Sequence, residues 1–322
     1  MGGSDSPAVQ AAAAYGSLRV RLSSPVEAWP YSQGVAAGLA VARTPGVGDA
    51  FRVELRRRLA GLAAYWDART APAAYDSRPA RRGAAYYDDN EWIGLDLVGA
   101  YDLLGDPSLL RRAQRVYRFV VSGWDTNAQD PCPGGVFWTR SPANRDRNTV
   151  STANGALLAL MLWRETGQAA YIQQASSMIA WVESCLADPS GLYRDHVGVD
   201  GTVDATLWSY NQGAMAAAYA LLFQATGDQH DLDLADAVAR RGLDRYVANG
   251  WANEPPEFAA IFFRDLAVVH TVDPGLDFGR QLADYATLLQ SRPPDGSVLA
   301  QAALVQVLAQ LAAGSTASAV DG

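Results

Sequence analysis

The sequence predicts an all-α protein whose helices close into an (α/α)6 toroid. Two observations support this prediction: a helical hairpin recurs along the chain, and about twelve segments have the length and apolar pattern of helices. The hairpins break at Gly105, Gly167 and Gly227, which are 62 and 60 residues apart. Paired helices repeated at this interval stack as a solenoid or close as a ring. We expect a ring, because the first and last helices can form a sixth pair.

The two helices of each repeat differ in character. The first is rich in Ala, Gly and Leu (GALLALMLWRE, QGAMAAAYALLF), which is typical of a helix packed on most sides. The second carries charge on one face (SLLRRAQRVYRF, DLADAVARRGLDRY) and therefore belongs to an outer layer. The expected helices are, in order, 6–20, 33–43, 50–67, 90–104, 107–121, 152–165, 169–186, 210–226, 231–247, 257–271, 277–291 and 297–312. Residues 1–313 then form a single domain, followed by a disordered tail at 314–322.

The connections alternate between short and long. The breaks within a pair are short, whereas residues 68–89, 122–151 and 187–209 form long loops from an outer helix to the next inner helix. Loops longer than about 12–15 residues in a compact domain are usually functional. Because all three would leave the toroid at the same end, we expect the functional site there.

Composition excludes several classes of function. The chain has 322 residues, 49% of them hydrophobic and 19% charged, which excludes a disordered protein. A net charge of −8 argues against nucleic acid or an anionic membrane as a partner. No apolar run approaches the roughly 18 residues of a transmembrane helix. All 26 basic residues are Arg, so lysine Schiff-base, pyridoxal phosphate and P-loop amine chemistry are excluded.

The residues that commonly bind metals are few. Two cysteines, Cys132 and Cys185, are too few for a zinc site or a disulfide framework, and whether they form one bridge stays open. The three histidines are widely separated, and residues 200–204 lack the alternating ligands of a calcium loop. We expect no metal, no cofactor and a monomer. The segment 1–5 lacks the features of a signal peptide, which leaves both a cytoplasmic and a processed, secreted protein open.

Two consecutive carboxylates lie among aromatic residues where the first long loop meets an inner helix, in the segment Tyr86 to Trp92 (YYDDNEW). Glycoside hydrolysis uses one acid to protonate the leaving oxygen and one carboxylate to attack, and a retaining pair lies about 5–5.5 Å apart. Neighbouring residues at a helix start can reach that spacing. An alternative interpretation is helix capping, because Asp88 with Glu91 three residues later resembles a capping box.

This segment resembles the catalytic Asp-Asp motif of glycoside hydrolase family 76, the α-1,6-mannanases. Four further segments are similar to that family in the same order: WPYSQ from Trp29, GGVFW from Gly134, NTVSTAN from Asn148 and WSYNQG from Trp208. The segment from Phe258 to Arg264 is also similar to the family. The resemblance spans residues 25–290 and implies an (α/α)6 barrel. It also implies that Asp88 is the nucleophile, that Asp89 is the general acid/base and that the anomeric configuration is retained.

Residues of the loops and of the loop–helix junctions are candidates for substrate contact. Aromatic rings can pack on the apolar face of a sugar, and uncharged donors and acceptors suit hydroxyl recognition. The alternatives are that Trp138 plugs the barrel, that Trp92 belongs to the core, that the amides cap helices and that Asp195-His196 forms a turn. The candidate substrate-binding residues are Tyr87, Trp92, Trp138, Asn148, Asn154, Asp195, His196, Tyr210, Asn211 and Gln212.

The sequence thus predicts a retaining endo-α-1,6-mannanase that acts on α-1,6-mannan or manno-oligosaccharides, with a secreted or cell-surface location favoured by the polymeric substrate. Two alternatives use the same toroid: a cell-wall mannan transglycosylase, in which a sugar hydroxyl intercepts the covalent intermediate, and a non-catalytic mannan-binding protein. A sugar epimerase fits less well, since epimerases of this shape use paired histidines. The presence of both Asp88 and Asp89 argues against a decayed site.

Overall fold

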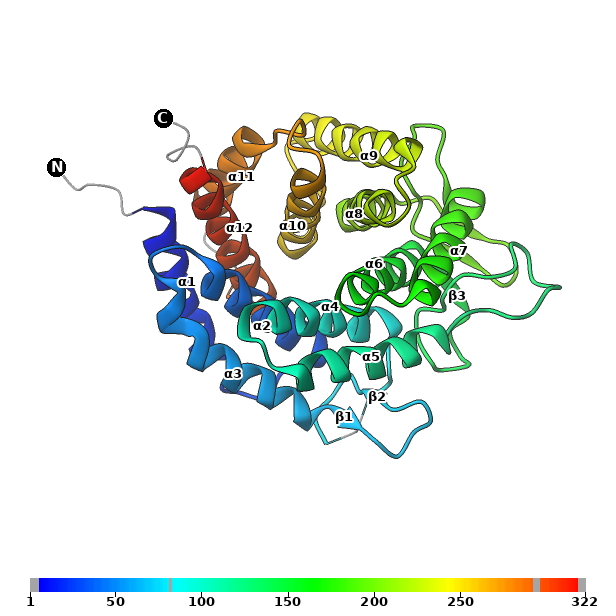
Figure 1. Cartoon of the computed structure of the whole chain (residues 1–322), viewed down its shortest axis with the longest axis horizontal. Helices are drawn as coiled ribbons and strands as arrows, with labels where there is room; N and C mark the ends of the chain where they lie inside the picture. Colours follow the sequence, from blue (N-terminus) through cyan, green and yellow to red (C-terminus); the bar gives the residue numbers. More distant parts are fainter. Residues whose placement is uncertain (1–5, 81–82, 292–295, 318–322) are drawn as a thin grey trace.

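A computed structural model of the chain describes residues 6–80, 83–291 and 296–317. Its helices form two concentric layers around a common axis (Figure 1). The inner layer consists of α2 (Ala28–Arg43), α4 (Tyr87–Leu104), α6 (Thr149–Thr166), α8 (Ser209–Thr226), α10 (Pro256–Val272) and α12 (Val298–Ala317). The outer layer consists of α1 (Pro7–Arg21), α3 (Arg52–Gly61), α5 (Pro107–Val121), α7 (Ala169–Leu186), α9 (Gln229–Ala248) and α11 (Gly279–Ser291).

The inner helices form a closed ring. Each contacts the next along the chain, and α12 contacts α2, which joins the end of the series to its beginning. The first helix, α1, packs on α12 and completes the sixth pair (Figure 1). The predicted (α/α)6 toroid is therefore confirmed. Within the part of the chain that the structure describes, no helix combines the length and the hydropathy that crossing a bilayer requires.

Local sequence explains the short turns at one end of the ring. Gly105, Gly167 and Gly227 end α4, α6 and α8 in the left-handed conformation, with φ of 66°, 70° and 76°, which glycine adopts without strain. After two of these turns an aspartate caps the next helix: Asp106 accepts a hydrogen bond from the Ser108 amide, and Asp228 accepts one from the His230 amide. Helix α5 then buries one stripe against the inner layer and exposes Arg111, Arg115 and Arg118.

Several helix bounds differ from the predicted ones. Helix α2 begins at Ala28 rather than at residue 33, because Pro30 lies in its first turn, where proline is tolerated. Helix α4 begins at Tyr87 rather than at residue 90. Helix α12 continues to Ala317, which corrects the disordered tail predicted from residue 314; residues 318–322 lie outside the described residues.

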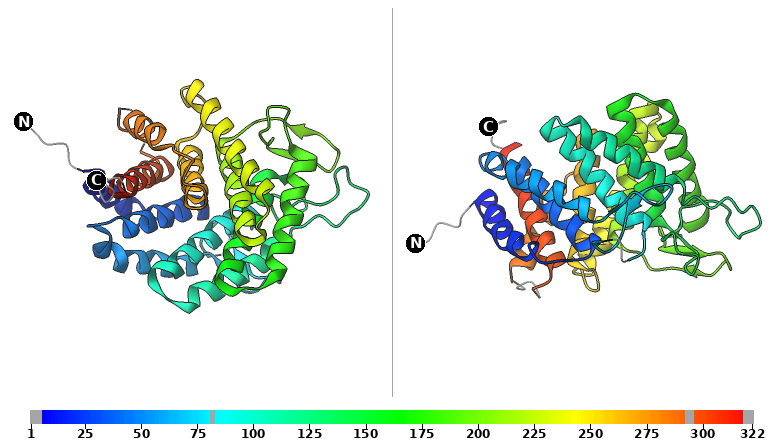
Figure 2. Two further views of the ribbon diagram at one scale, coloured as in Figure 1. Left: turned by 45° about the horizontal axis from the view of Figure 1, so that its top comes forward. Right: turned by 90° about the horizontal axis from the view of Figure 1, so that it is seen from below.

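The long loops contain short strands that the sequence analysis did not predict. Strand β1 (Trp66–Asp67) pairs with β2 (Ala74–Tyr75), both before α4. Strand β3 (Asp146–Asn148), before α6, pairs antiparallel with β4 (His196–Gly198), before α8, and β4 pairs with β5 (Val203–Asp204). Strands β3, β4 and β5 join loops of two different repeats, and the long loops project from one side of the helical ring (Figure 2).

A disulfide between Cys132 and Cys185 fastens the loop before α6 to the end of α7. The same loop packs closely on Trp181, whose indole nitrogen donates a hydrogen bond to the Cys132 carbonyl. A Cβ atom added at Gly135 would lie 2.5 Å from the Trp181 ring, so only glycine permits this approach. The bridge that the sequence left open is therefore formed, and it fixes the segment that carries Trp138.

Candidate active site

A cleft of about 700 Å³ opens at the end of the toroid that carries the long loops. First-turn residues of the inner helices form its floor, and loop residues form its walls. Asp88, Trp138, Asp195 and Tyr210 all line it, although they come from three different repeats. The predicted convergence of these residues at one end of the ring is therefore what the structure shows.

The long loops are held in place by the helices that follow them. The fourth residue of three successive inner helices binds the backbone of the preceding loop. The Asn90 side chain accepts a hydrogen bond from the Tyr75 amide at 2.7 Å and donates one to the Tyr75 carbonyl. Thr152 accepts from the Val136 amide at 2.9 Å, and Gln212 exchanges two bonds of 2.8 Å with the Tyr193 backbone. Residues at the same place in three repeats thus hold three different loops that form the walls of the cleft.

Asp88 lies in the first turn of α4 and is held by two donors. One carboxylate oxygen accepts a hydrogen bond from the Asp89 amide at 2.9 Å, and the other accepts one from Nε1 of Trp138 at 3.1 Å. Burial raises the pKa of Asp88 to about 6, while these hydrogen bonds oppose the rise. The N-cap of α4 is Tyr86, so Asp88 is not the capping residue that the alternative interpretation required.

Asp89 has a different environment from its neighbour. No residue that the structure describes donates a hydrogen bond to its carboxyl group. Burial, the charge of Asp88 and then the charge of Glu27 raise the pKa of Asp89 well above its usual range. Because Asp88 has two donors and Asp89 has none, Asp88 is the member that ionises more easily. The pair can therefore supply one carboxylate and one carboxylic acid near neutral pH.

Aromatic rings line the cleft on both sides of this pair. Trp138 is 38% exposed and packs on Tyr86 with ring centroids 5.0 Å apart, so it is a wall of the cleft and not a plug in the barrel. Trp92 is only 2% exposed and contacts Trp29 at 5.9 Å. Trp92 therefore belongs to the core and also forms part of the floor.

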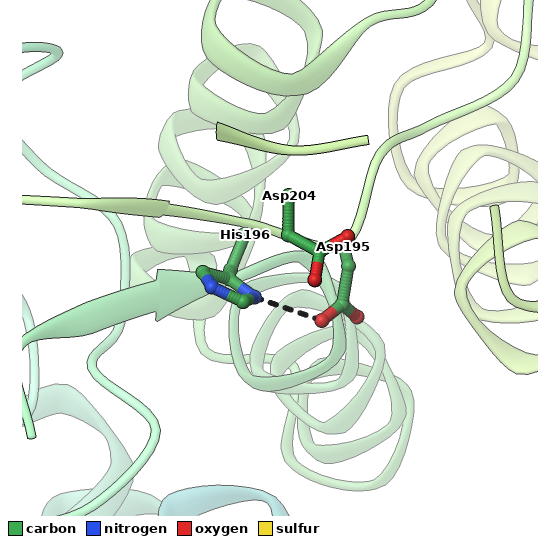
Figure 3. Close-up of side chains that lie close together, drawn as sticks. All are labelled: Asp195, His196 and Asp204. Atoms are coloured by element: carbon green, nitrogen blue, oxygen red, sulfur yellow. Dashed lines mark hydrogen bonds and ion pairs between the residues drawn. The ribbon is translucent and has the colours of Figure 1, made fainter. Parts of the chain in front are cut away.

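Asp195 and His196 lie on the wall that strand β4 forms. One oxygen of Asp195 accepts a hydrogen bond from the Asn211 amide group at 3.2 Å, and the other bonds Nδ1 of His196 at 2.9 Å (Figure 3). The bond to Asp195 is the main cause of a raised pKa of His196, and burial opposes it. His196, Asp195 and Asp204 also have potential ligand atoms within 4.8 Å of one another. The Asp195–His196 bond and the two bonds from Thr206 to Oδ1 of Asp204 already occupy some of these atoms.

Asn148 lines the cleft at the end of β3 and is 6% exposed. Its side-chain oxygen is buried and has no partner among the described residues. A buried acceptor without a donor is uncommon in proteins. Asn148 therefore has a buried acceptor without a donor at the edge of the cleft.

Four predicted contact residues lie beneath the cleft surface, which revises their expected role. Tyr87 is buried and stacks on Phe119 with centroids 4.4 Å apart. Asn154 is fully buried, and its amide group donates to the Val150 carbonyl one turn earlier. Asn211 positions Asp195, and Gln212 positions the loop at Tyr193. Successive residues of a helix point about 100° apart, so only Tyr210 of the Tyr210–Gln212 segment reaches the cleft.

The cleft also contains residues that the sequence analysis did not select. Trp29 and Phe258 lie in segments that resemble the family, and their position at the start of an inner helix was the signal that could have identified them. Tyr86 also lies in such a segment, the one that contains Asp88 and Asp89. Glu27 and Asp146 had no comparable signal, because their position depends on how the loops fold. With Asp88, Asp89 and Asp195, the residues Glu27 and Asp146 make the cleft predominantly acidic.

Comparison with known proteins agrees with this arrangement. The model of glycosyl hydrolase family 76 matches residues 11–285. Mannan endo-1,6-alpha-mannosidase DCW1 of Candida glabrata is 35% identical over 132 residues, which cover 38% of this chain and 28% of that protein. Mannan endo-1,6-alpha-mannosidase DFG5 of Saccharomyces cerevisiae is 28% identical over 189 residues, which cover 53% of this chain and 40% of that protein. These matches therefore span less than half the length of the curated relatives.

Solved structures share the fold at lower identity. A family 76 mannosidase of Bacteroides thetaiotaomicron superposes with a TM-score of 0.80 at 23% identity, covering 91% of this chain and 88% of that one. An inactive variant of the α-1,6-mannanase GH76A of Salegentibacter sp. HEL1_6, in complex with α-1,6-mannotriose, superposes with a TM-score of 0.71 at 18% identity, covering 89% of both. The family match over most of the chain, together with the toroid, shows that this protein is a member of glycosyl hydrolase family 76.

Proposed function

We propose that the protein is a retaining endo-α-1,6-mannanase that cleaves α-1,6-linked mannan through a covalent mannosyl-enzyme. The observation that carries the proposal is the pair Asp88 and Asp89, two adjacent carboxyl groups with unequal hydrogen bonding on the floor of the cleft. The names of the relatives support the substrate, because they are mannan endo-1,6-alpha-mannosidases. The GH76A variants solved with α-1,6-mannotriose and α-1,6-mannotetraose are inactive and have two consecutive aspartates replaced.

In the first step Asp89 protonates the glycosidic oxygen while Asp88 attacks the anomeric carbon. The bond from that carbon to the leaving oxygen breaks, and a bond to the Asp88 carboxylate forms on the opposite face. In the second step the Asp89 carboxylate accepts a proton from water as the water attacks the same carbon and releases Asp88. Two inversions give net retention. An inverting reaction would need carboxyl groups about 6.5–9.5 Å apart, which adjacent residues in one helical turn do not favour.

The environment of each carboxyl group suits its role in this reaction. The Trp138 indole and the Asp89 amide stabilise the Asp88 carboxylate, and the helix N-terminus favours the same charge. Asp89, which lacks donors, retains its proton until the leaving oxygen is in position. Trp138 is exposed enough to pack on a pyranose ring, and Asn148 and Asp195 can accept hydrogen bonds from hydroxyl groups.

A secreted or cell-surface location is part of the same proposal. Disulfides persist in oxidising compartments and are rare in the cytosol, and Cys132 and Cys185 form one. A polymeric mannan would be met outside the cell. Fractionation of the native host with an antibody against the protein tests this location, and recovery only in the cytosol would contradict it.

The reaction is tested with linear α-1,6-mannan and with reduced α-1,6-manno-oligosaccharides. Endo hydrolysis should release a series of short oligosaccharides, and proton NMR should show the α-anomer as the first-formed product. Mass spectrometry of a trapped intermediate should place a mannosyl or manno-oligosaccharide group on the peptide that contains Asp88. A β-configured first product would exclude Asp88 as nucleophile. Products longer than the substrate would instead indicate transglycosylation, and binding without cleavage would indicate a mannan-binding protein.

A further inference from the structure

A second cavity lies at the opposite end of the toroid, and we call it the rear cavity. Its volume is about 350 Å³, and no residue lines both it and the cleft. All six inner helices contribute to it from their C-terminal halves. Representative lining residues, one from each helix in order, are Leu39, Asp96, Met161, Leu221, Arg264 and Gln310. A volume of this size is at the lower end of the range of about 300–1,000 Å³ that is usual for small-molecule sites.

Three polar atoms of residues that line the rear cavity lack hydrogen-bond partners among the described residues. Asp96 is 5% exposed, and its Oδ2 atom is buried without a hydrogen bond to any described residue. Nη2 of Arg264 and Oε1 of Gln310 are buried and unpaired in the same way. Polar groups removed from water are nearly always paired in proteins. Glu91 also has unpaired oxygens, but it lines neither cavity.

The chemistry of these groups indicates a ligand with hydroxyl groups. Arg264 offers a donor and Gln310 an acceptor. Burial raises the pKa of Asp96 to about 7, against the opposing charges of Arg264 and Arg43, so near neutral pH its carboxyl group can either donate or accept. A hydroxyl group, which both donates and accepts, can satisfy every member of such a set. Leu39, Leu221 and other apolar side chains supply contacts for C–H faces.

Ionic ligands fit this cavity less well. At its rim Asp102 pairs with Arg43 at 3.7 Å and with Arg164 at 3.4 Å, so these charges already have partners. An anion would meet Asp96 and the negative C-terminal ends of the inner helices. A cation would meet Arg264, whose Nε donates to Asp265.

From these observations we infer that the rear cavity binds a small neutral polyol, a monosaccharide or a disaccharide, through Asp96, Arg264 and Gln310. This site is distinct from the cleft, and the inference holds whether or not the cleft hydrolyses mannan. A ligand in the rear cavity would contact Arg264, which also packs beneath the floor of the cleft. The Arg264 guanidinium lies 5.1 Å from the centre of the Trp92 ring, and Trp92 forms part of that floor.

Calorimetric titration of the full chain carrying Asp89→Asn, which prevents consumption of the probe, tests the inference. The probes are D-mannose and α-1,6-mannobiose, with sodium phosphate as an anionic comparison. We expect the sugars to occupy two sites per chain and phosphate to occupy neither. Phosphate binding that displaces mannose from the rear site would overturn the assignment of a neutral ligand.

Variants assign each site. Gln310→Ala and the cavity-filling Ala40→Phe should weaken the rear site about tenfold or more and leave the cleft unchanged. Trp138→Ala should weaken binding in the cleft and leave the affinity of the rear site unchanged. Gln301→Ala is the matched control, because Gln301 is also on α12 with an unpaired buried oxygen but does not line the rear cavity. A single site that Trp138→Ala removes and both rear variants leave intact would overturn the inference, as would two sites insensitive to Gln310→Ala and Ala40→Phe.

Discussion

The two ends of the helical ring are built by different kinds of interaction. At the rear end, short turns are made by residues close together in the chain: a left-handed glycine ends one helix, and in two of the turns an aspartate begins the next. At the cleft end, long loops are held by contacts distant in sequence, such as Gln212 with Tyr193 and Trp138 with Asp88. The rear turns therefore depend on local conformational preference, whereas the cleft depends on the packing of the whole ring.

This difference predicts that changes at the cleft end separate activity from stability. The largest effect is expected for Asp89→Asn, which removes the proposed acid/base without changing the shape of the side chain. General acid–base catalysis contributes about 100- to 10,000-fold, so we expect kcat on linear α-1,6-mannan to fall about 1,000-fold. The melting temperature should stay the same or rise, since a buried acid is replaced by a neutral amide. Parental activity in this variant would remove Asp89 from the mechanism.

The next largest effect concerns the disulfide that fixes the loop of Trp138. Replacing both Cys132 and Cys185 by Ser should lower the free energy of unfolding by about 2–4 kcal/mol, because the unfolded chain is no longer constrained. Urea unfolding monitored by circular dichroism measures this change. Dithiothreitol should destabilise the parent protein in the same way and leave the double variant unaffected. Equal stability of parent and variant in oxidising buffer would show that the bridge does not stabilise the folded protein.

A smaller effect is expected from Trp138→Phe, which keeps an aromatic wall but removes the indole donor to Asp88. A hydrogen bond to a charged group is worth about 1.5–3 kcal/mol, so kcat/KM should fall about ten- to 100-fold. The bond favours the Asp88 carboxylate, and its loss should raise the pKa of Asp88 above about 6. Because the nucleophile must be ionised, activity declines as pH falls through that pKa, and the acid limb of the pH profile should move to higher pH. An unchanged acid limb would mean that another group controls it.

The smallest effect is expected at the rear end. Asp228→Ala removes the N-cap of α9 and should cost about 1 kcal/mol of stability. Mannan hydrolysis at 25 °C should be unchanged, because this turn has no contact with the cleft. Asp228→Asn, which can still cap, should restore the stability. A loss of activity in Asp228→Ala that exceeds its loss of folded protein would contradict the independence of the two ends.

The sequence alone determined the helical layers and their order. Apolar periodicity and glycine breaks are local properties, and the predicted bounds of α5 (107–121) and α7 (169–186) agree with the structure. The pair Asp88–Asp89 could also be identified, because two consecutive carboxylates among aromatic residues form a recognisable pattern within one segment. The start of α4 was predicted three residues late, since acidic residues are compatible both with a loop and with the first turn of a helix.

Tertiary structure decided which polar side chains reach the cleft and which hold the scaffold. Tyr210 and Gln212 are two residues apart in one motif, yet one lines the cleft and the other binds the backbone of a loop. The hydrogen bond that distinguishes Asp88 from Asp89 comes from Trp138, fifty residues away along the chain. Such contacts depend on closing the ring and on the pairing of β3 with β4. Local sequence preference does not encode them, because they exist only when several distant segments pack together.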